Sequence, residues 1–284
     1  MSSPDLRGKT IVITGANSGI GLIAAKALAK MGATLVLACR SLERGAIAQA
    51  AVQEAAGHDR VSLVRCDLGD LADIRQAGAT LAALPRIDVL LNNAGAYNAE
   101  ARRTADDLEL TFGANHVGPY LLTNLLLDRI KATPGARVIN VASAAHLGGH
   151  LVWDDLGYER RGYQALRAYC DSKLMNMLFT HALARRLEGS GAVTNCLHPG
   201  AVATNFAVND TGAFAALARL GSIFLLSPEA GAATSIFLAS DPAGGATNGR
   251  YYSRRSLAWC PQKARNDEDA ERLWEISKAI TGVG

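Results

Sequence analysis

The sequence predicts an α/β fold in which residues 1–284 form a single doubly wound domain around a parallel sheet of about seven strands. Short β-branched runs alternate with Ala- and Leu-rich helical patterns along the whole chain. A glycine-rich turn separates the first such run from the first helical pattern, and no linker, repeat or low-complexity segment interrupts the series. Such an unbroken alternation is typical of a parallel sheet with helices on both faces.

The composition excludes several classes of partner. The 284 residues are 49% hydrophobic and 19% charged, which supplies enough apolar surface for a large core. The net charge of +3 is small and no Lys/Arg-rich run occurs, so we expect no nucleic-acid partner. The six histidines show no zinc-ligand spacing, so we expect no metal site.

Cysteine usage and the N-terminal residues bear on location. The five cysteines are odd in number and form no CxxC pair, which favours reduced thiols in a cytoplasmic protein. The first ten residues are polar and lead directly into a strand, so we expect neither a signal peptide nor a membrane anchor.

Each expected strand is a short apolar run that ends at a turn signal. These runs cover residues 10–14, 34–38, 61–66, 87–91, 137–142, 193–197 and 249–253. Helical patterns fill the intervals: one ends near residue 31, one near residue 188, and others cover about 42–56, 106–131, 228–240 and 266–280.

The first turn is a candidate phosphate-binding loop. Its glycines let the backbone turn tightly, and the free N–H groups at the start of the next helix can receive an anion, as in a Rossmann-type fold. The spacing is G-x-x-x-G-x-G rather than G-x-G-x-x-G, and a purely structural turn is the alternative. The expected contacts are Gly15, Asn17, Ser18, Gly19, Ile20 and Gly21.

The end of the second strand favours NADP over NAD. An acidic residue there would bond the ribose 2′-hydroxyl of NAD, whereas an arginine accommodates the 2′-phosphate of NADP. This sequence has Arg40, followed by Ser41 and, nearby, Arg44. A solvated arginine at a strand end is the alternative interpretation.

Turns after the third and fourth strands add candidate cofactor contacts. Asp67 and Leu68 end the third strand, and the Asp67 carboxylate would accept from an adenine amino group or cap the helix that begins near residue 70. Asn93, Ala94 and Gly95 follow the fourth strand in a tight turn that would bring backbone close to the cofactor.

Four polar residues later in the chain are the catalytic candidates. Tyr169 and Lys173 are four apart and share a helix face, where the ammonium is expected to lower the phenol pKa. Ser143 follows the fifth strand and would point into the ligand crevice, unless it merely caps a turn. Asn115 lies in a helical pattern disturbed by glycines and a proline, where it would back-bond locally or hold a kink and a water.

Taken in order, these motifs resemble the short-chain dehydrogenase/reductase family over nearly the whole chain. The motifs are Thr14-Gly15-x3-Gly19-Ile20-Gly21, Asp67, Asn92-Asn93-Ala94-Gly95, Asn115, Ser143, Tyr169-x3-Lys173 and Pro199-Gly200 with Thr204. Segments such as Asn115-His116-Val117-Gly118 and Trp153-Asp154-Asp155-Leu156 are similar to the retinol dehydrogenase-like branch. Membrane-bound members of that branch carry a hydrophobic N-terminal anchor, which we do not expect here.

The resemblance implies roles for the catalytic candidates. Tyr169 would be the general acid in reduction and the general base in oxidation, while Lys173 would bond the nicotinamide ribose. Ser143 would hold the substrate carbonyl, and Asn115 a water that links Lys173 to solvent.

The resemblance also implies further cofactor contacts. Asn93, Ala94 and Gly95 would line the adenosine half of the cofactor, with Asp67 at the adenine. The implied contacts on the nicotinamide side are Pro199, Gly200, Val202 and Thr204.

The expected function is that of an NADP(H)-dependent carbonyl reductase or alcohol dehydrogenase for a lipophilic aldehyde, ketone or alcohol. An apolar substrate flap at about 201–227, with Phe206, Phe214 and Phe224, favours the lipophilic substrate. A reductase of a conjugated double bond and a non-catalytic NADP-binding or sensing protein are the alternatives. Family analogy allows a homodimer or homotetramer, in which the helices that hold Asn115 and Tyr169 would pair.

Overall fold

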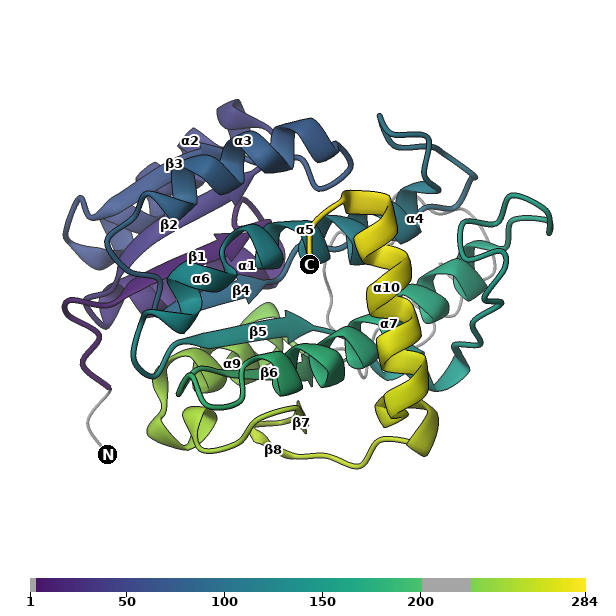
Figure 1. The fold of residues 1–284 in the computed structure, drawn as a ribbon. Coiled ribbons are helices and arrows are strands. Elements are labelled where there is room, and N and C mark those ends of the chain that lie inside the picture. The colour runs from purple at the N-terminus through teal and green to yellow at the C-terminus, as the bar shows by residue number, and fades with distance from the viewer. Residues whose placement is uncertain (1–3, 201–225) are drawn as a thin grey trace.

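A computed structural model describes residues 4–200 and 226–284, which form one eight-stranded sheet with helices on both faces (Figure 1). The strand order is β3-β2-β1-β4-β5-β6-β7-β8, and every pairing but the last is parallel. The strands are β1 Thr10–Thr14, β2 Thr34–Cys39, β3 Val61–Arg65, β4 Val89–Asn92, β5 Arg137–Val141, β6 Val193–His198, β7 Arg250–Ser253 and β8 Ser256–Leu257.

The two faces of the sheet divide the core into two layers. On β1, Ile11 and Ile13 pack toward one layer and Val12 toward the other, as the two-residue period of a strand requires. Both sets are fully buried, which explains why the central strands have continuous apolar sequences. One layer is covered by α1 (Gly19–Lys30), α2 (Leu42–Ala56) and α9 (Pro228–Ser240), and the other by α3 (Leu71–Ala82), α5 (Gly118–Leu125) and α7 (Ala165–Arg186).

All seven expected strands are present, and the expectation of about seven missed one. β8 has only two residues and runs antiparallel to β7, with Ser253 opposite Ser256. The two-residue turn between them puts Arg254 and Arg255 at φ values of 50° and 64°, a conformation in which glycine or asparagine is usual. Because the turn contains neither residue, no hairpin signal is present there.

The helix expected over 106–131 is broken into four pieces. These are α4 (Leu110–Phe112), a π-helical turn (Gly113–Val117), α5 and α6 (Leu127–Lys131). The break coincides with the glycines that disturb the pattern. Gly118 is required because an added Cβ there would lie 2.4 Å from the carbonyl oxygen of Leu68.

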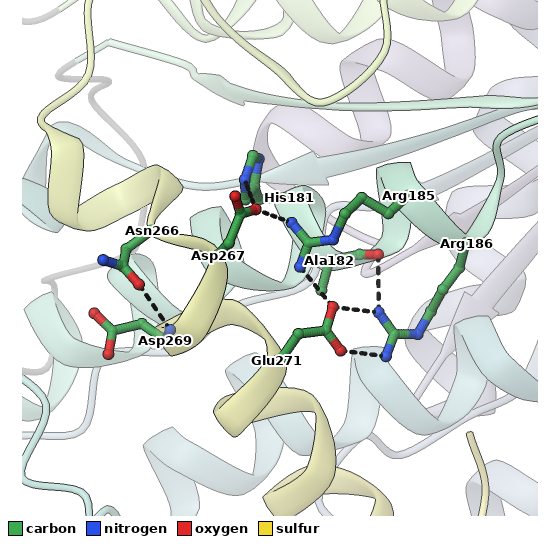
Figure 2. Close-up of polar contacts among 8 residues, drawn as sticks. All are labelled: His181, Ala182, Arg185, Arg186, Asn266, Asp267, Asp269 and Glu271. Carbon is green, nitrogen blue, oxygen red and sulfur yellow. Dashed lines mark hydrogen bonds and ion pairs between the residues drawn. The ribbon is translucent and has the colours of Figure 1, made fainter.

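The C-terminal helix α10 (Asp267–Thr281) packs across the C-terminal half of α7 (Figure 1). Trp274 is buried against Phe179 and against Tyr120, whose ring centroid is 4.8 Å away. The Glu271 carboxylate pairs with Arg186 at 2.7 Å and with Arg185 at 2.5 Å (Figure 2). The hydrophobic contacts and ion pairs together fix α10 on α7.

This arrangement bears on the expected homodimer or homotetramer. The ion pairs in Figure 2 cover α7 from His181 to Arg186. On the π-helical turn, His116 Nε2 lies 2.8 Å from Ser277 Oγ of α10. Pairing of two copies through this face would have to displace α10, and the oligomeric state stays a prediction.

Candidate functional site

The glycine-rich turn after β1 packs so closely against the turn after β4 that two of its positions have no room for a side chain. Gly15 has φ +64°, and an added Cβ would lie 3.0 Å from Ala94. At Gly21 an added Cβ would lie 2.4 Å from Asn93 Nδ2, so only glycine fits. Helix α1 starts at Gly19, and its N-cap Ser18 makes no side-chain cap hydrogen bond. The turn therefore has the close backbone approach and the helix start that suit a pyrophosphate.

Thr14 joins the turn after β1 to the turn after β4. Its hydroxyl oxygen accepts from the backbone N–H groups of Asn93 and Ala94, each at 3.0 Å. In return, Asn93 Nδ2 donates to the Thr14 carbonyl oxygen at 2.9 Å. The sequence motif contains Thr14 but does not predict this bridging role. Its position directly before Gly15, at the end of a buried strand, was the available signal.

The turns after β2 and β3 lie at the same edge of the sheet. Arg40 is exposed there, and Ser41 caps α2 by accepting from the Arg44 N–H at 3.3 Å. Asp67 Oδ1 accepts from the Gly69 N–H at 3.0 Å, while Asp70 caps α3. The alternative in which Asp67 caps that helix is therefore wrong, and Leu68 is buried beside it.

Three of the four catalytic candidates come together around α7. Ser143, at the end of β5, lies beside the phenol of Tyr169 and lowers its pKa. Lys173 is buried and donates to the Val141 carbonyl oxygen at 3.0 Å, with its Nζ 5.5 Å from the centre of the Tyr169 ring. An added Cβ on Gly95 would lie 3.2 Å from that Nζ, so the turn after β4 faces the same group.

Asn115 lies one step away, on the π-helical turn. Its Oδ1 accepts from the Ala96 N–H at 2.7 Å, and its Nδ2 donates to the Ala96 carbonyl oxygen at 2.8 Å and to Ser172 Oγ at 3.1 Å. The side chain thus pins the turn after β4 to α7. Its implied role in holding a water for Lys173 stays a prediction.

The electrostatics of the pair differ from the expectation. Burial raises the pKa of Tyr169 to about 12, although the neighbouring Ser143 hydroxyl opposes that rise. Burial also lowers the pKa of Lys173 to about 8. In the chain itself the net shift of the phenol pKa is upward, because desolvation of the phenol outweighs the effect of Ser143. The expected effect of the Lys173 ammonium on this pKa stays a prediction.

An aromatic side chain from the turn after β4 also contacts Tyr169. Tyr97, which belongs to none of the predicted motifs, packs its ring edge-on to Tyr169 with centroids 6.0 Å apart. Its place two residues after Gly95 was the only signal.

Pro199 and Gly200 follow β6 at the same edge. Outside the described residues lie Val202, Thr204 and the flap residues Phe206, Phe214 and Phe224.

Comparison with known proteins decides the family. A family model described as short chain dehydrogenase matches residues 9–213. The chain belongs to the short-chain dehydrogenase family. It is 40% identical to human retinol dehydrogenase 11 over 99% of this chain and 88% of that protein. It is 42% identical to bovine dehydrogenase/reductase SDR family member 13 over 98% of this chain and 74% of that protein.

Solved structures of other proteins share the fold. A protein from Mycobacterium paratuberculosis has a TM-score of 0.82 at 32% identity, covering 99% of this chain and 96% of its own. A short chain dehydrogenase from Burkholderia cenocepacia, solved in complex with NADP, has a TM-score of 0.69 at 26% identity, covering 88% and 99%. The resemblance to the retinol dehydrogenase-like branch is confirmed by the curated relatives. Within the described ranges, no helix has the length and apolar character to span a membrane.

Proposed function

We propose that this short-chain dehydrogenase is an NADP(H)-dependent carbonyl reductase or alcohol dehydrogenase for lipophilic aldehydes, ketones or the matching alcohols. The observation that carries the proposal is the placement of Ser143 beside the Tyr169 phenol, whose pKa it lowers, with the buried Lys173 ammonium near the same ring. A proton donor and a hydrogen-bond donor that meet at one point suit the oxygen of a reacting carbonyl.

The residues of the turns fit a dinucleotide. Gly15 and Gly21 form a cradle that a Cβ would fill, and the start of α1 would receive the pyrophosphate. Arg40 would meet a 2′-phosphate, which favours NADP. When bound, the nicotinamide supplies or accepts the hydride. The NADP in the Burkholderia structure, at 26% identity, supports the same cofactor for this chain.

The protein's own groups manage the proton and the orientation of the substrate. In reduction, Tyr169 would give its phenolic proton to the carbonyl oxygen as negative charge develops there, and Ser143 would donate a hydrogen bond to the same oxygen. The raised pKa of Tyr169 keeps this proton in place at neutral pH. In oxidation the same phenol would receive the proton from the alcohol.

The name of the relatives supports an alcohol or aldehyde on a long apolar chain, because several are called retinol dehydrogenases. A reductase of a conjugated double bond remains the second candidate, since the same Tyr-Lys pair could protonate an enolate. The intact set of Ser143, Tyr169 and Lys173 disfavours a non-catalytic sensor.

The test is oxidation of NADPH in the presence of a panel of aldehydes, ketones and conjugated enones. We expect turnover of at least one lipophilic aldehyde or ketone, and we expect Tyr169→Phe to abolish it while NADPH still binds. Tyr252→Phe, on β7, is the matched control and should retain activity. A wild-type protein that binds NADPH but turns over no carbonyl compound would contradict the proposal.

A further inference from the structure

The peptide group that joins Ser143 to Ala144 is contacted on both sides by an imidazole. Its carbonyl oxygen lies 2.6 Å from Nδ1 of His146. Its N–H, on Ala144, donates to Nδ1 of His198 at 3.2 Å. Both atoms belong to one rigid planar unit, so the two rings together fix the orientation of that plane.

The two contacts require opposite tautomers. A carbonyl oxygen only accepts, so Nδ1 of His146 carries a proton; a backbone N–H only donates, so Nδ1 of His198 carries none. Nε2 of His146 is buried without a hydrogen-bond partner in the described part of the chain, which fits an unprotonated nitrogen. Burial lowers the pKa of His146, and it lowers that of His198 to about 4, so both rings are neutral at physiological pH.

Both rings are themselves held by the fold. His146 is 1% exposed and packs edge-on to Tyr251 of β7, with ring centroids 5.1 Å apart. His198 is the last residue of β6, next to β5 in the sheet. Farther along the turn, the Lys263 ammonium donates to the carbonyl oxygens of Leu147 and Gly149, at 2.9 and 2.7 Å. The turn after β5 is thus fixed from β6, β7 and the C-terminal segment.

The turn also packs tightly against the helix that carries Tyr169. An added Cβ on Gly149 would lie 2.7 Å from Leu174 Cβ and 2.8 Å from the Cys170 carbonyl oxygen, both on α7. A rotation of the Ser143–Ala144 peptide would therefore move the Ser143 hydroxyl relative to the phenol. A misplacement of about 1 Å at a reacting group can cost on the order of 100-fold in rate.

We propose that His146 and His198 are positioning residues that clamp the Ser143–Ala144 peptide from both sides and so aim the Ser143 hydroxyl at Tyr169 and the substrate oxygen. Neither ring needs to touch the substrate. The inference rests on the proposed carbonyl reduction, in which Ser143 is a catalytic residue, and adds two residues that no motif assigned.

The kinetic test uses His198, because its ring is only half-buried and its loss leaves the smaller cavity. We expect His198→Ala to lower kcat about 10- to 100-fold with the best substrate of the panel, with an unchanged dissociation constant for NADPH. His198→Asn should restore most of the rate, since asparagine Oδ1 can accept the Ala144 N–H as Nδ1 does. The control His150→Ala, on an exposed histidine, should keep the wild-type kcat.

Two kinetic outcomes would overturn the clamp. One is a His198→Ala variant that folds and keeps the wild-type kcat. The other is a His198→Asn variant that loses as much rate as His198→Ala, since the acceptor would then be irrelevant. If the wild-type protein turns over no substrate at all, the proposed function fails, and the clamp is then decided by a measurement that needs no activity.

That measurement is the tautomer of each ring, from long-range proton–nitrogen correlation spectra of the full chain at neutral pH. The histidine signals are assigned by single His→Asn variants. We expect the proton of His146 on Nδ1 and that of His198 on Nε2. A proton on the same nitrogen in both rings would be incompatible with the two contacts, as would a His198 ring with protons on both nitrogens. Either result would overturn the proposal whether or not the protein is active.

Discussion

Arg40 is the residue at which we expect the choice between NADP and NAD to be made. Arg40 is exposed at the end of β2, where a 2′-phosphate would lie, and it stands at the position where an acidic residue would favour NAD. Arg40→Asp should raise the ratio of kcat/KM for NADH to that for NADPH by at least about tenfold, because a carboxylate repels the phosphate and can bond a 2′-hydroxyl. Lys131→Asp, the same charge change on α6 at the opposite edge, is the control, and an unchanged cofactor ratio in Arg40→Asp would contradict the assignment.

Lys173 gives the site a predicted pH dependence. Burial lowers its pKa from 10.5 to about 8, so its positive charge is present below pH 8 and is lost as the pH rises through that value. Tyr169, with a pKa near 12, stays protonated over this range. We expect kcat/KM for NADPH, which reports ionisations of the free enzyme, to fall by about tenfold per pH unit well above pH 8.

Lys173→Arg separates this cause from others, because a guanidinium keeps its charge far above pH 8. Its profile should be flat over the same range, even at a lower absolute rate. A wild-type profile that stays level up to about pH 9.5 would show that the charge on Lys173 does not control cofactor capture.

The positions of the candidate residues on strands and helices could be predicted from the sequence, but their ionisation could not. The four-residue spacing of Tyr169 and Lys173 correctly placed both on α7, and the strand end correctly placed Ser143. The sign of the Tyr169 pKa shift depends on how much solvent the folded chain removes from the phenol, and spacing carries no such information. The contact of His198 with Ala144 could not be predicted, because the two residues are 54 positions apart in the sequence. The contact of His146 with Ser143 spans only three positions, but it depends on how the turn after β5 folds.

At the scale of elements, Trp274 is the largest buried side chain of α10. Trp274 is 2% exposed, stacks with Phe179 and lies 3.7 Å below the Arg186 guanidinium. Trp274→Ala should cost about 3–5 kcal/mol and lower Tm by roughly 10 °C. Trp259→Ala is the matched control, because that side chain is 74% exposed and its loss should change stability by less than about 0.5 kcal/mol. Equal Tm values for the two variants, measured by circular dichroism, would show that α10 contributes little to the fold.

The broken helix shows where element-level reasoning from sequence ends. Gly113, Gly118 and Pro119 signalled a disturbance, and the break is there. The signal did not distinguish a kink from a π-helical turn, because the turn is stabilised by contacts from outside the segment. Those contacts include Asn115 with Ala96, and His116 with Ser277 of α10.

For the whole molecule, the strand order explains why the candidate site lies at the carboxyl ends of the central strands. The chain winds outward from β1 through β2 to β3, and then crosses back to place β4 on the other side of β1. Ligands of doubly wound sheets bind outside the carboxyl ends of the strands at such a reversal. Alternation of strands and helices predicted the sheet, but the reversal between β1 and β4 is a long-range pairing that no local pattern encodes.

This topology predicts which backbone amides NADPH should protect. Saturating NADPH should slow hydrogen exchange in the turns at the carboxyl edge, 15–21 and 93–95, because they would line the cofactor. Turns at the amino edge, such as 57–60 before β3 and 132–136 before β5, are the internal control and should exchange at an unchanged rate. At 100 times its dissociation constant, NADPH should also add about 2.7 kcal/mol to the free energy of unfolding. NADH at the same concentration should protect less if Arg40 selects the 2′-phosphate. Protection confined to the amino edge would place the cofactor on the wrong side of the sheet and contradict the assignment, whatever the kinetics show.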